Sequence, residues 1–426
     1  MRRIYSLLIL CAAPCAFAVL LWRGLRDRSY WQGLGERFGR GRSVSAPPVW
    51  LHAVSLGEMS AAAPLLRAIQ TRHPQIPLLL TTATPAGRAR AEALFGADAD
   101  VRFLPYDTPG SVRRFLARIR PRLAIIMETE LWPNLFAECE RREVPVFLVN
   151  ARLSAKSVAR YRRFGALFSG VFTANVQVAA QSALDADRFR SIGAAPSRIH
   201  VAGNVKFDLQ PVAGIIDQGR ILRAAFGAGR PVWIAGSTHA GEEEQLLDAH
   251  ARLLTEQPEA LLLLVPRHKD RFAAVAELLA RRGVRFARRS DGIAPDASSQ
   301  VLLVDTVGEL ALLYAAADVA FVGGSLVDVG GHNLLEPAAL GLPVLTGPQY
   351  FNSRDIALLL LERGAALQVA DARELAAVLR RLLKDPEERR RIGATGKDIV
   401  ASNRGSVARL LDLMDPQLAD SPPAAR

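Results

Sequence analysis

Short apolar runs alternate with longer amphipathic stretches along most of the chain after Pro47-Pro48. Such alternation predicts parallel strands joined by helices. A first series predicts strands at 49–54, 77–80, 101–104, 123–127, 144–149, 177–180 and 199–202, with helices at 59–70, 87–95, 112–119 and 182–192. A second series predicts strands at 232–235, 260–265, 284–287, 301–304, 319–322 and 343–345.

These two series predict an α/β protein with two Rossmann-like, doubly wound domains and a cleft between them. The predicted N-terminal domain covers residues 49–210, a linker covers 211–230, and the C-terminal domain covers 231–414. Residues 415–426 are rich in proline, serine and alanine, so we expect a disordered tail there.

The N-terminus carries an uncharged apolar run at residues 4–22, bounded by Arg2-Arg3 and Arg23. A membrane span needs about 20 apolar residues, so residues 1–22 are predicted to be a membrane anchor. A cleaved signal peptide is the alternative, because Ala16-Phe17-Ala18 resembles a cleavage site. The apolar run continues beyond that triplet, which favours an uncleaved anchor.

More arginines follow this run than precede it, which predicts that the domains lie on the cytoplasmic side. Residues 23–48 combine arginines with Tyr30, Trp31, Leu34 and Phe38. This pattern is typical of an amphipathic patch on an anionic membrane surface. A solvated linker fits it equally well, and the sequence leaves both open.

The charge and cysteine content of the chain limit the classes of partner and the compartment that fit it. Its 426 residues carry a net charge of +12, which predicts an acidic partner: a membrane, a phosphorylated ligand or a nucleic acid. There is no zinc-knuckle spacing and no basic run interleaved with aromatics, so we expect no nucleic acid. The three cysteines form no disulfide framework, which fits a reducing compartment.

Residues 321–348 form the most informative stretch, because strand, glycine turn, helix and strand make one βαβ unit there. The turn Gly323-Gly324-Ser325 lets the backbone approach a phosphate or sugar closely. The carboxylate of Glu336 can accept hydrogen bonds from two ribose hydroxyls. These features predict a nucleotide-sugar site. The alternative is a plain glycine turn in which Glu336 only favours its helix dipole.

Polar residues also follow strands of the first series. Glu58 comes after the first strand, where it is either a capping box with Ser55 or a general base. Glu128 and Glu130 follow strand 123–127. A structural alternative makes one of them a carboxylate in the first turn of the next helix, but it explains the presence of both less readily. Lys206 lies near the domain junction and suits a carboxylate or phosphate partner.

In the second series, hydroxyls, glycine amides and Arg267 come together at one predicted sheet edge, which suits phosphate recognition. The segments concerned are 236–239, 266–269 and 305–310. Two Asp-x-Asp strings, at 98–100 and 185–187, are of the kind that holds Mg²⁺. Neither directly ends an apolar strand, so we interpret both as solvated carboxylates and predict no metal.

Together these segments resemble the bacterial Kdo (3-deoxy-D-manno-octulosonic acid) transferases of lipopolysaccharide synthesis. The resemblance extends in order over nearly the whole chain up to about residue 400. Besides the anchor, it is carried by HAVSLGE at 52–58, METELWPN at 127–134, GNVKFD at 203–208, GSTH at 236–239, PRH at 266–268, GGS at 323–325 and NLLE at 333–336.

The resemblance implies an inverting, metal-independent glycosyltransferase of the GT-B fold, with CMP-Kdo as donor and no other cofactor. It implies Glu58 as general base, with Glu128 and Lys206 supporting the transition state and Glu130 sharing the work of Glu128. The CMP-binding positions that it implies are Pro266, Arg267, Gly308, Glu309, Leu310, Asn333, Leu334, Leu335 and Glu336.

The acceptor implied by the resemblance is a lipid A precursor, lipid IVA, at the cytoplasmic side of the bacterial inner membrane. Two other functions fit the residues less closely. One is another membrane-associated GT-B enzyme of envelope synthesis that uses a UDP-sugar. The other is a membrane-tethered nucleotide-sugar-binding protein without catalysis, against which the trio Glu58, Glu128 and Lys206 argues.

Overall fold

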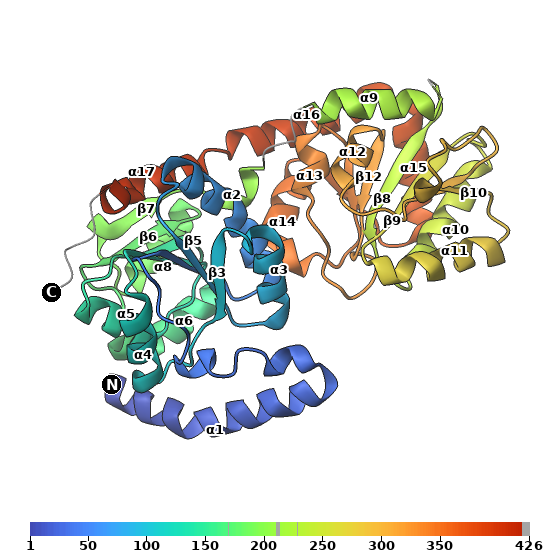
Figure 1. Cartoon of the computed structure of the whole chain (residues 1–426). Coiled ribbons are helices and arrows are strands. Elements are labelled where there is room, and N and C mark those ends of the chain that lie inside the picture. The colour runs from blue at the N-terminus through green and yellow to red at the C-terminus, as the bar shows by residue number, and fades with distance from the viewer. Residues whose placement is uncertain (169, 210–213, 228, 420–426) are drawn as a thin grey trace. The chain divides into compact units, whose positions relative to one another are not determined.

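The computed structural model describes residues 1–168, 170–209, 214–227 and 229–419, and it divides into two compact units. The first unit contains Met1–Asp208 and the C-terminal segment from Asn403 onward, and the second contains Leu209–Ser402 (Figure 1). Each unit is built on its own sheet, as the two series of strands predict.

The first unit contains a seven-stranded sheet with the order β3-β2-β1-β4-β5-β6-β7, and its paired strands are parallel. Apolar side chains cover both faces, because helices pack on each side of the sheet. The strands are β1 (Val49–His52), β2 (Leu78–Thr82), β3 (Ala99–Phe103), β4 (Leu123–Met127), β5 (Val146–Ala151), β6 (Val176–Ala180) and β7 (Ile199–Val201).

Helices of the first unit begin at side-chain caps that the sequence supplies. Ser55, Thr84, Thr108, Ser154 and Ser182 each accept a hydrogen bond from an amide in the first turn of the following helix. The helices are α1 (Arg2–Arg26), α2 (Leu56–Arg72), α3 (Pro85–Phe95), α4 (Pro109–Ile119), α5 (Pro133–Arg141), α6 (Ala155–Arg163), α7 (Gly165–Phe168), α8 (Ala183–Ser191) and α17 (Ser406–Ala419), with the 3-10 turns η1 (Arg28–Trp31), η2 (Glu36–Phe38), η3 (Pro196–Arg198) and η4 (Val205–Phe207).

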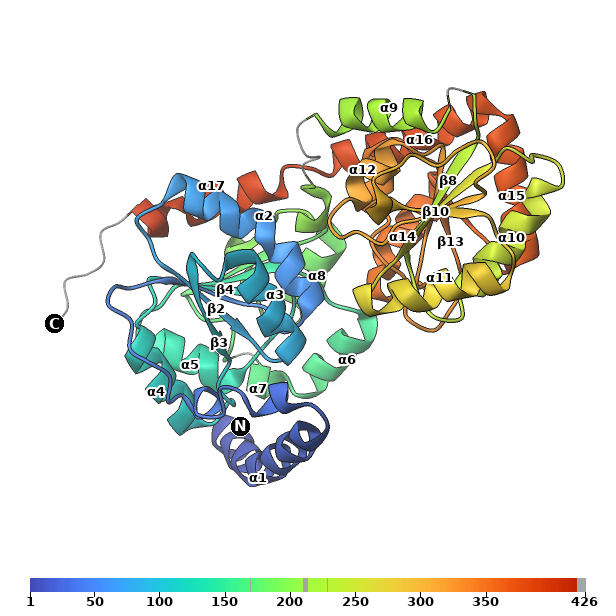
Figure 2. The ribbon, with the colours of Figure 1, turned by 45° about the vertical axis from the view of Figure 1, so that its right-hand side comes forward.

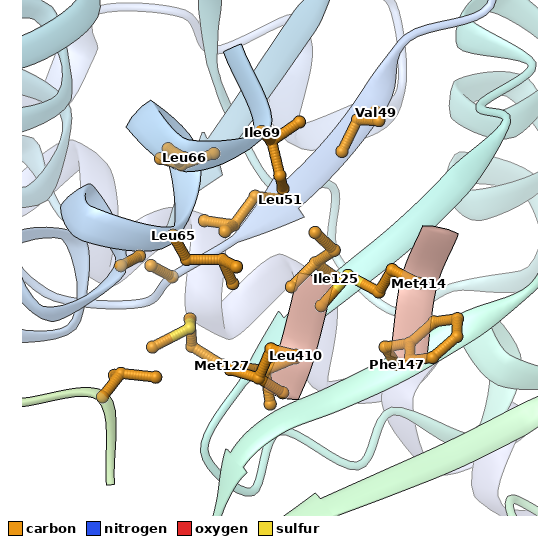
Figure 3. Close-up of a cluster of buried hydrophobic side chains, with 14 of the residues drawn as sticks. Val49, Leu51, Leu65, Leu66, Ile69, Ile125, Met127, Phe147, Leu410 and Met414 are labelled. Carbon is orange, nitrogen blue, oxygen red and sulfur yellow. The ribbon is translucent and has the colours of Figure 1, made fainter. Parts of the chain in front are cut away.

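The C-terminal segment of the chain completes the core of the first unit. Leu410 and Met414 of α17 are fully buried against β1, β4 and α2 (Figure 3). The predicted tail is therefore wrong for residues 415–419, which are helical, and residues 420–426 lie outside the described residues. The predicted limit of the C-terminal domain at 414 is also wrong, because the second unit ends at Ser402.

The second unit repeats the architecture with the strand order β10-β11-β9-β8-β12-β13-β14, again parallel. Helices α10, α11 and α15 cover one face of this sheet, and α9 and α12 cover the other (Figure 2). The strands are β8 (Val232–Thr238), β9 (Leu261–Pro266), β10 (Phe286–Arg288), β11 (Val301–Leu303), β12 (Val319–Val322), β13 (Val344–Thr346) and β14 (Ala366–Gln368).

Most of the linker predicted at 211–230 is a helix of the second unit. Ile215 and Phe226 are buried, and Gly219 meets Ala315 so closely that an added Cβ would lie 2.5 Å from its side chain. Residues 211–213 and 228 lie outside the described residues. The helices are α9 (Ile215–Ala225), α10 (Glu243–Leu254), α11 (Phe272–Arg281), α12 (Leu310–Ala315), α13 (Leu335–Ala339), α14 (Arg354–Glu362), α15 (Ala372–Lys384) and α16 (Pro386–Ser402), with the 3-10 turns η5 (Lys269–Arg271), η6 (Arg289–Asp291) and η7 (Phe351–Ser353).

The apolar N-terminus forms the 25-residue helix α1. By its length and composition, this helix is able to cross a membrane. Many of its apolar side chains are exposed, among them Ile4, Leu7 and Leu8. One side of the helix meets the first unit, where the rings of Phe17 and Phe38 pack edge to face with centroids 5.4 Å apart.

Two alternatives were predicted for residues 23–48, an amphipathic patch on a membrane surface and a solvated linker. Neither describes the whole segment. Arg37 is 5% exposed, and its guanidinium lies 4.0 Å from the centre of the Phe103 ring. Phe38 packs on Tyr106. The segment is therefore part of the first unit rather than a solvated linker, and the charge of Arg37 is withdrawn from any membrane surface.

Shortening Leu410 to alanine tests whether α17 belongs to the first core. We expect Leu410→Ala to destabilise the first unit by about 3 kcal/mol, because it leaves a cavity in a packed core. Hydrogen exchange of the β4 and β8 amides in urea distinguishes the two units. In the control Leu184→Ala, at a side chain that is 58% exposed, we expect little change. Equal protection of β4 in both variants would contradict this assignment.

Candidate functional site

In each unit, the residues that could carry chemistry gather where the strand order reverses. This point lies between β1 and β4 in the first sheet and between β8 and β12 in the second. Connections leave adjacent strands in opposite directions there, so the carboxyl edge is open to a ligand. Glu58 and Glu128 follow β1 and β4, and Thr238 and Gly323 mark the ends of β8 and β12.

Glu58 lies in the first turn of α2, and its carboxylate is held by the chain just before the helix. One oxygen accepts a hydrogen bond from the Val54 amide at 2.9 Å, and the other accepts one from the Ser55 hydroxyl at 3.1 Å. The Ser55 hydroxyl also accepts a bond from the Glu58 amide at 3.3 Å. Ser55 therefore caps α2 as predicted, but Glu58 accepts from the Val54 amide and not from the Ser55 amide that a regular capping box uses. These bonds orient the Glu58 carboxylate and leave it available for a chemical role.

Burial raises the pKa of Glu58 above its ordinary value, and the charge of Glu128 adds to this effect. The bonds from Val54 and Ser55 and the charge of Lys206 act in the opposite direction. The structure thus brings the predicted trio of Glu58, Glu128 and Lys206 within electrostatic reach. A carboxylate that is partly desolvated and still ionised is a stronger base than one in water.

Glu128 and Glu130 occupy the loop between β4 and α5. Glu128 has φ +56°, a left-handed conformation that is uncommon for a residue with a side chain and costs about 1 kcal/mol. Its amide donates to the Val149 carbonyl at 2.8 Å, and its carboxylate lies 3.9 Å from the Arg152 guanidinium. The surrounding fold therefore holds this loop in a strained conformation.

Glu130 is a buried acid with a raised pKa. Burial, reinforced by the negative charges of Glu58 and Glu128, raises its pKa to about 7. It therefore keeps its proton to a higher pH than an ordinary glutamate. The first unit thus brings three carboxyl groups, those of Glu58, Glu128 and Glu130, within electrostatic reach of one another.

Lys206 is placed by a network that the sequence did not reveal. Its amide donates to the Asn204 side chain at 3.0 Å, and the Val205 amide donates to the Asn150 side chain at 3.2 Å. Asn150 is 1% exposed and has φ +57° at the end of β5, and Gln181 donates to its carbonyl at 2.9 Å. An asparagine that ends a buried apolar strand was the signal available in the sequence.

The glycine turn of the second unit differs from the prediction. The carboxylate of Glu242, which is fully buried, accepts hydrogen bonds from the amides of Gly324, Ser325 and Leu326 at 2.7 to 3.0 Å. A side chain of the protein itself thus occupies the amides that were expected to face a phosphate. The role of Gly323-Gly324 is close packing, since a Cβ on Gly323 would lie 2.5 Å from the Ser237 carbonyl oxygen.

Three histidines gather beside Arg267 at the same edge of the second sheet. The Nε2 atoms of His239 and His332 are 2.7 Å apart, and their rings stack with an interplanar angle of 11°. The His268 ring meets that of His239 edge to face. Burial lowers the pKa of His332 to about 4, and the charge of Arg267 adds to this effect. The Arg267 side chain is exposed at this edge, and, in addition to burial, its charge lowers the pKa of both His239 and His332.

Asn333 and Glu336 form a pair at the start of α13. The Asn333 amide group donates to the Glu336 carboxylate at 3.1 Å, and its oxygen accepts from the Leu335 amide at 3.1 Å. Burial raises the pKa of Glu336, while Asn333 and the charge of Arg267 lower it. Leu334 and Leu335 are fully buried, so their side chains support this pair from the core.

Gly308, Glu309 and Leu310 lie beyond β11 at the start of α12. The Glu309 carboxylate binds Arg289 at 2.8 Å, so its charge is already paired. Leu310 reaches toward the end of β8, where its Cδ1 would lie 3.2 Å from a Cβ on Gly236. Of the predicted CMP-binding positions, the structure thus brings together Arg267, Asn333 and Glu336, whereas Glu309 turns to another partner. Pro266 ends β9 directly before Arg267.

The interpretation of both Asp-x-Asp strings as solvated is wrong for Asp185. This residue is 8% exposed, and its carboxylate accepts hydrogen bonds from the Leu153 amide at 3.0 Å and the Ser182 hydroxyl at 2.6 Å. It therefore ties α8 to the end of β5 as a structural group. Asp98, Asp100 and Asp187 are exposed, as predicted.

Comparison with known proteins identifies both halves of the chain. Residues 32–209 match the family model for 3-deoxy-D-manno-octulosonic-acid transferase (kdotransferase), and residues 296–399 match the model for glycosyl transferases group 1. A 3-deoxy-D-manno-octulosonic acid transferase of Haemophilus influenzae is 41% identical to the chain. That alignment covers 98% of this chain and 99% of that protein.

Two solved structures are also similar. The C-terminal CMP-Kdo binding domain of WaaA from Acinetobacter baumannii is 37% identical over 44% of this chain and 98% of its own, with a TM-score of 0.42. UDP-GlcNAc 2-epimerase from Neisseria meningitidis is 14% identical over 87% of this chain and all of its own, with a TM-score of 0.57, and shares the fold. With its two parallel sheets of GT-B type, the chain belongs to the 3-deoxy-D-manno-octulosonic acid transferase family of glycosyltransferases.

Proposed function

We propose that the protein transfers Kdo from CMP-Kdo to a lipid A precursor, lipid IVA, with inversion at the anomeric carbon and without a metal ion. The observation that carries this proposal is Glu58, a partly buried carboxylate with raised pKa at the carboxyl end of β1, next to Glu128 and Lys206. Membership of the Kdo transferase family supports the choice of sugar.

In this mechanism Glu58 takes the proton from an acceptor hydroxyl as its oxygen attacks the anomeric carbon of Kdo. The bond from that carbon to the CMP phosphate oxygen breaks, and its electron pair leaves with CMP. Attack from the side opposite CMP inverts the centre. The bonds from Val54 and Ser55 fix the carboxylate, so little reorganisation is needed when the proton moves.

Lys206 and Glu128 set the charge around Glu58. The Lys206 ammonium favours the ionised form of Glu58, which a base requires, and the Glu128 carboxylate opposes it. Glu128 also suits the positive charge that develops on the sugar ring in an oxocarbenium-like transition state. Its strained backbone supports a role in the reaction rather than in folding.

The second unit holds the donor in this proposal. Arg267 is the charged group available for the CMP phosphate, because Glu242 already occupies the glycine-turn amides. Glu336, oriented by Asn333, accepts hydrogen bonds from the ribose hydroxyls. Arg267 and Glu336 influence each other electrostatically, so one ligand is able to contact both.

The proposal also places the enzyme at the bacterial inner membrane, anchored by α1, with both units on the cytoplasmic side. The net charge of +12 favours an anionic membrane surface and a phosphorylated lipid acceptor. The excess of arginines after the anchor supports the cytoplasmic side.

The role of Glu58 is tested by Glu58→Gln. We expect its rate of Kdo transfer from CMP-Kdo to lipid IVA to fall at least about 100-fold, because the amide cannot accept the proton. The wild type should keep its rate in EDTA. The exposed Glu92→Gln serves as the matched control. If Glu58→Gln folds, binds CMP and transfers Kdo at the wild-type rate, Glu58 is not the base.

The pH dependence of the reaction tests the coupling of Glu58 to Glu128. Protonated Glu58 is no base, so the rate should fall as the pH drops through its raised pKa. Glu128→Gln removes a negative charge that raises this pKa. The acid limb of kcat/KM should therefore move to lower pH, whatever the remaining rate. A limb that stays in place or moves to higher pH would contradict the coupling.

The donor site is tested by ligand protection from thermal unfolding, since a ligand of the native state raises stability. We expect CMP to raise the Tm of the wild type more than UDP does. In Glu336→Gln the shift by CMP should shrink, because a charged acceptor for the ribose is lost. The control is Glu362→Gln, an exposed position in α14. A larger shift with UDP would instead favour a UDP-sugar as donor.

A further inference from the structure

The N-terminal end of α1 is hydrogen-bonded to residues beside the candidate catalytic loop, which is the segment 128–132 between β4 and α5. The Tyr5 hydroxyl donates to the Asp107 carboxylate at 3.0 Å, and the Ser6 hydroxyl donates to the Asn134 side chain at 2.8 Å. Asp107 and Asn134 are 5% and 6% exposed. An apolar helix that served only to enter lipid would not require buried polar partners in the soluble part of the protein.

Asp107 also caps the helix that follows the catalytic loop. Its carboxylate accepts from the amides of Asn134 at 3.1 Å and Leu135 at 2.8 Å, and its carbonyl accepts from the Asn134 side chain at 2.7 Å. The residue before α5, Trp132, offers no cap of its own. Asp107 thus does from another loop what a Ser or Thr does at α2, α3, α4, α6 and α8.

Burial and hydrogen bonding have opposite effects on the pKa of Asp107. Burial raises its pKa to about 6, and the bonds from Asn134, Tyr5 and Leu135 act against this effect. Above that pH the carboxylate is ionised, and each bond that it accepts from a neutral donor is charge-assisted. Loss of the Tyr5 bond leaves a buried charge with one donor fewer.

The catalytic loop is therefore fixed at both ends. At one end it leaves β4 through the strained backbone of Glu128. At the other end it enters α5, whose first turn is held by Asp107 and Asn134. Glu128 and Glu130 lie in the short segment between these points. A small shift of the first turn of α5 would move both carboxylates.

The remainder of α1 packs along one face against the rest of the first unit. Its partly or fully shielded residues recur every three to four positions, which places them on one helix face. The opposite face is exposed and largely apolar. The shielded residues are Tyr5, Ser6, Ile9, Ala13, Phe17, Leu20 and Gly24.

We propose that Asp107, with Tyr5 and Ser6, is a positioning network that couples the seating of α1 to the geometry of the Glu128–Glu130 loop. In this proposal, α1 influences the kcat of the enzyme in addition to attaching it to a membrane. This inference rests on the proposed Kdo transfer, because it concerns the loop that carries the acids. It does not depend on which side of the membrane the enzyme occupies.

Tyr5→Phe is the most direct test, because it removes one hydrogen bond and keeps the apolar ring. In the full-length chain in detergent, with CMP-Kdo and lipid IVA, we expect kcat to fall about tenfold. The KM for CMP-Kdo and the stoichiometry of CMP binding should not change. Binding to vesicles of phosphatidylethanolamine and phosphatidylglycerol should also be unchanged. Tyr30→Phe makes the same chemical change elsewhere in the N-terminal segment and should match the wild type.

A double-mutant cycle separates this network from a merely structural effect. If Tyr5 acts through Asp107, adding Tyr5→Phe to Asp107→Asn should lower kcat no further. Ser6→Ala gives an independent mild variant should Asp107→Asn fail to fold. An active wild type with an equally active Tyr5→Phe would overturn the inference and leave the proposed function intact. A kcat that falls only in proportion to vesicle binding would also overturn it. An inactive wild type would overturn the proposed function itself.

Discussion

Desolvation of glutamates at the carboxyl edges of two parallel sheets is the constraint on which both candidate sites depend. Burial raises the pKa of four glutamates: Glu58, Glu130, Glu242 and Glu336. Each of these carboxyl groups has a different set of hydrogen-bonding and charged neighbours. The Glu242 carboxylate is bound by backbone amides of the glycine turn and is structural, whereas Glu58 lies beside the charged groups of Glu128 and Lys206. Identical side chains thus take different roles because their partners differ.

The same edges explain why, within each unit, residues far apart in sequence come together in a candidate site. Parallel strands deliver their carboxyl ends to one side, and the reversal of strand order opens that side between β1 and β4 and between β8 and β12. Glu58, Glu128 and Lys206 follow three different strands, and each is set by its own local device. These devices are the hydrogen bonds at the start of α2, a left-handed backbone and a buried asparagine network. Helix α1 is tied into this arrangement through Asp107.

Much of this was predictable from the sequence, since buried parallel strands are continuous apolar runs. Strand 123–127 has the predicted bounds, and both sheets follow the predicted series. β14 was missed because its three residues, Ala366–Gln368, are too short and mixed to stand out. The start of the tail was misjudged because its composition concealed Leu418, whose burial depends on a distant surface of the first unit. The domain limit was misplaced for the same reason, because Leu410 and Met414 pack in that core. Likewise, no local pattern shows that Glu242 fills the glycine turn or that Asp107 caps α5, because these contacts join segments 82 and 27 positions apart.

The most direct test of the account is the structure of the lipid product. Lipid IVA incubated with the protein and CMP-Kdo is recovered, weighed by mass spectrometry and examined by NMR at the new linkage. The account predicts a lipid that has gained Kdo, with an anomeric configuration opposite to that of the donor. A lipid of unchanged mass, or Kdo attached with the configuration of the donor, would contradict it.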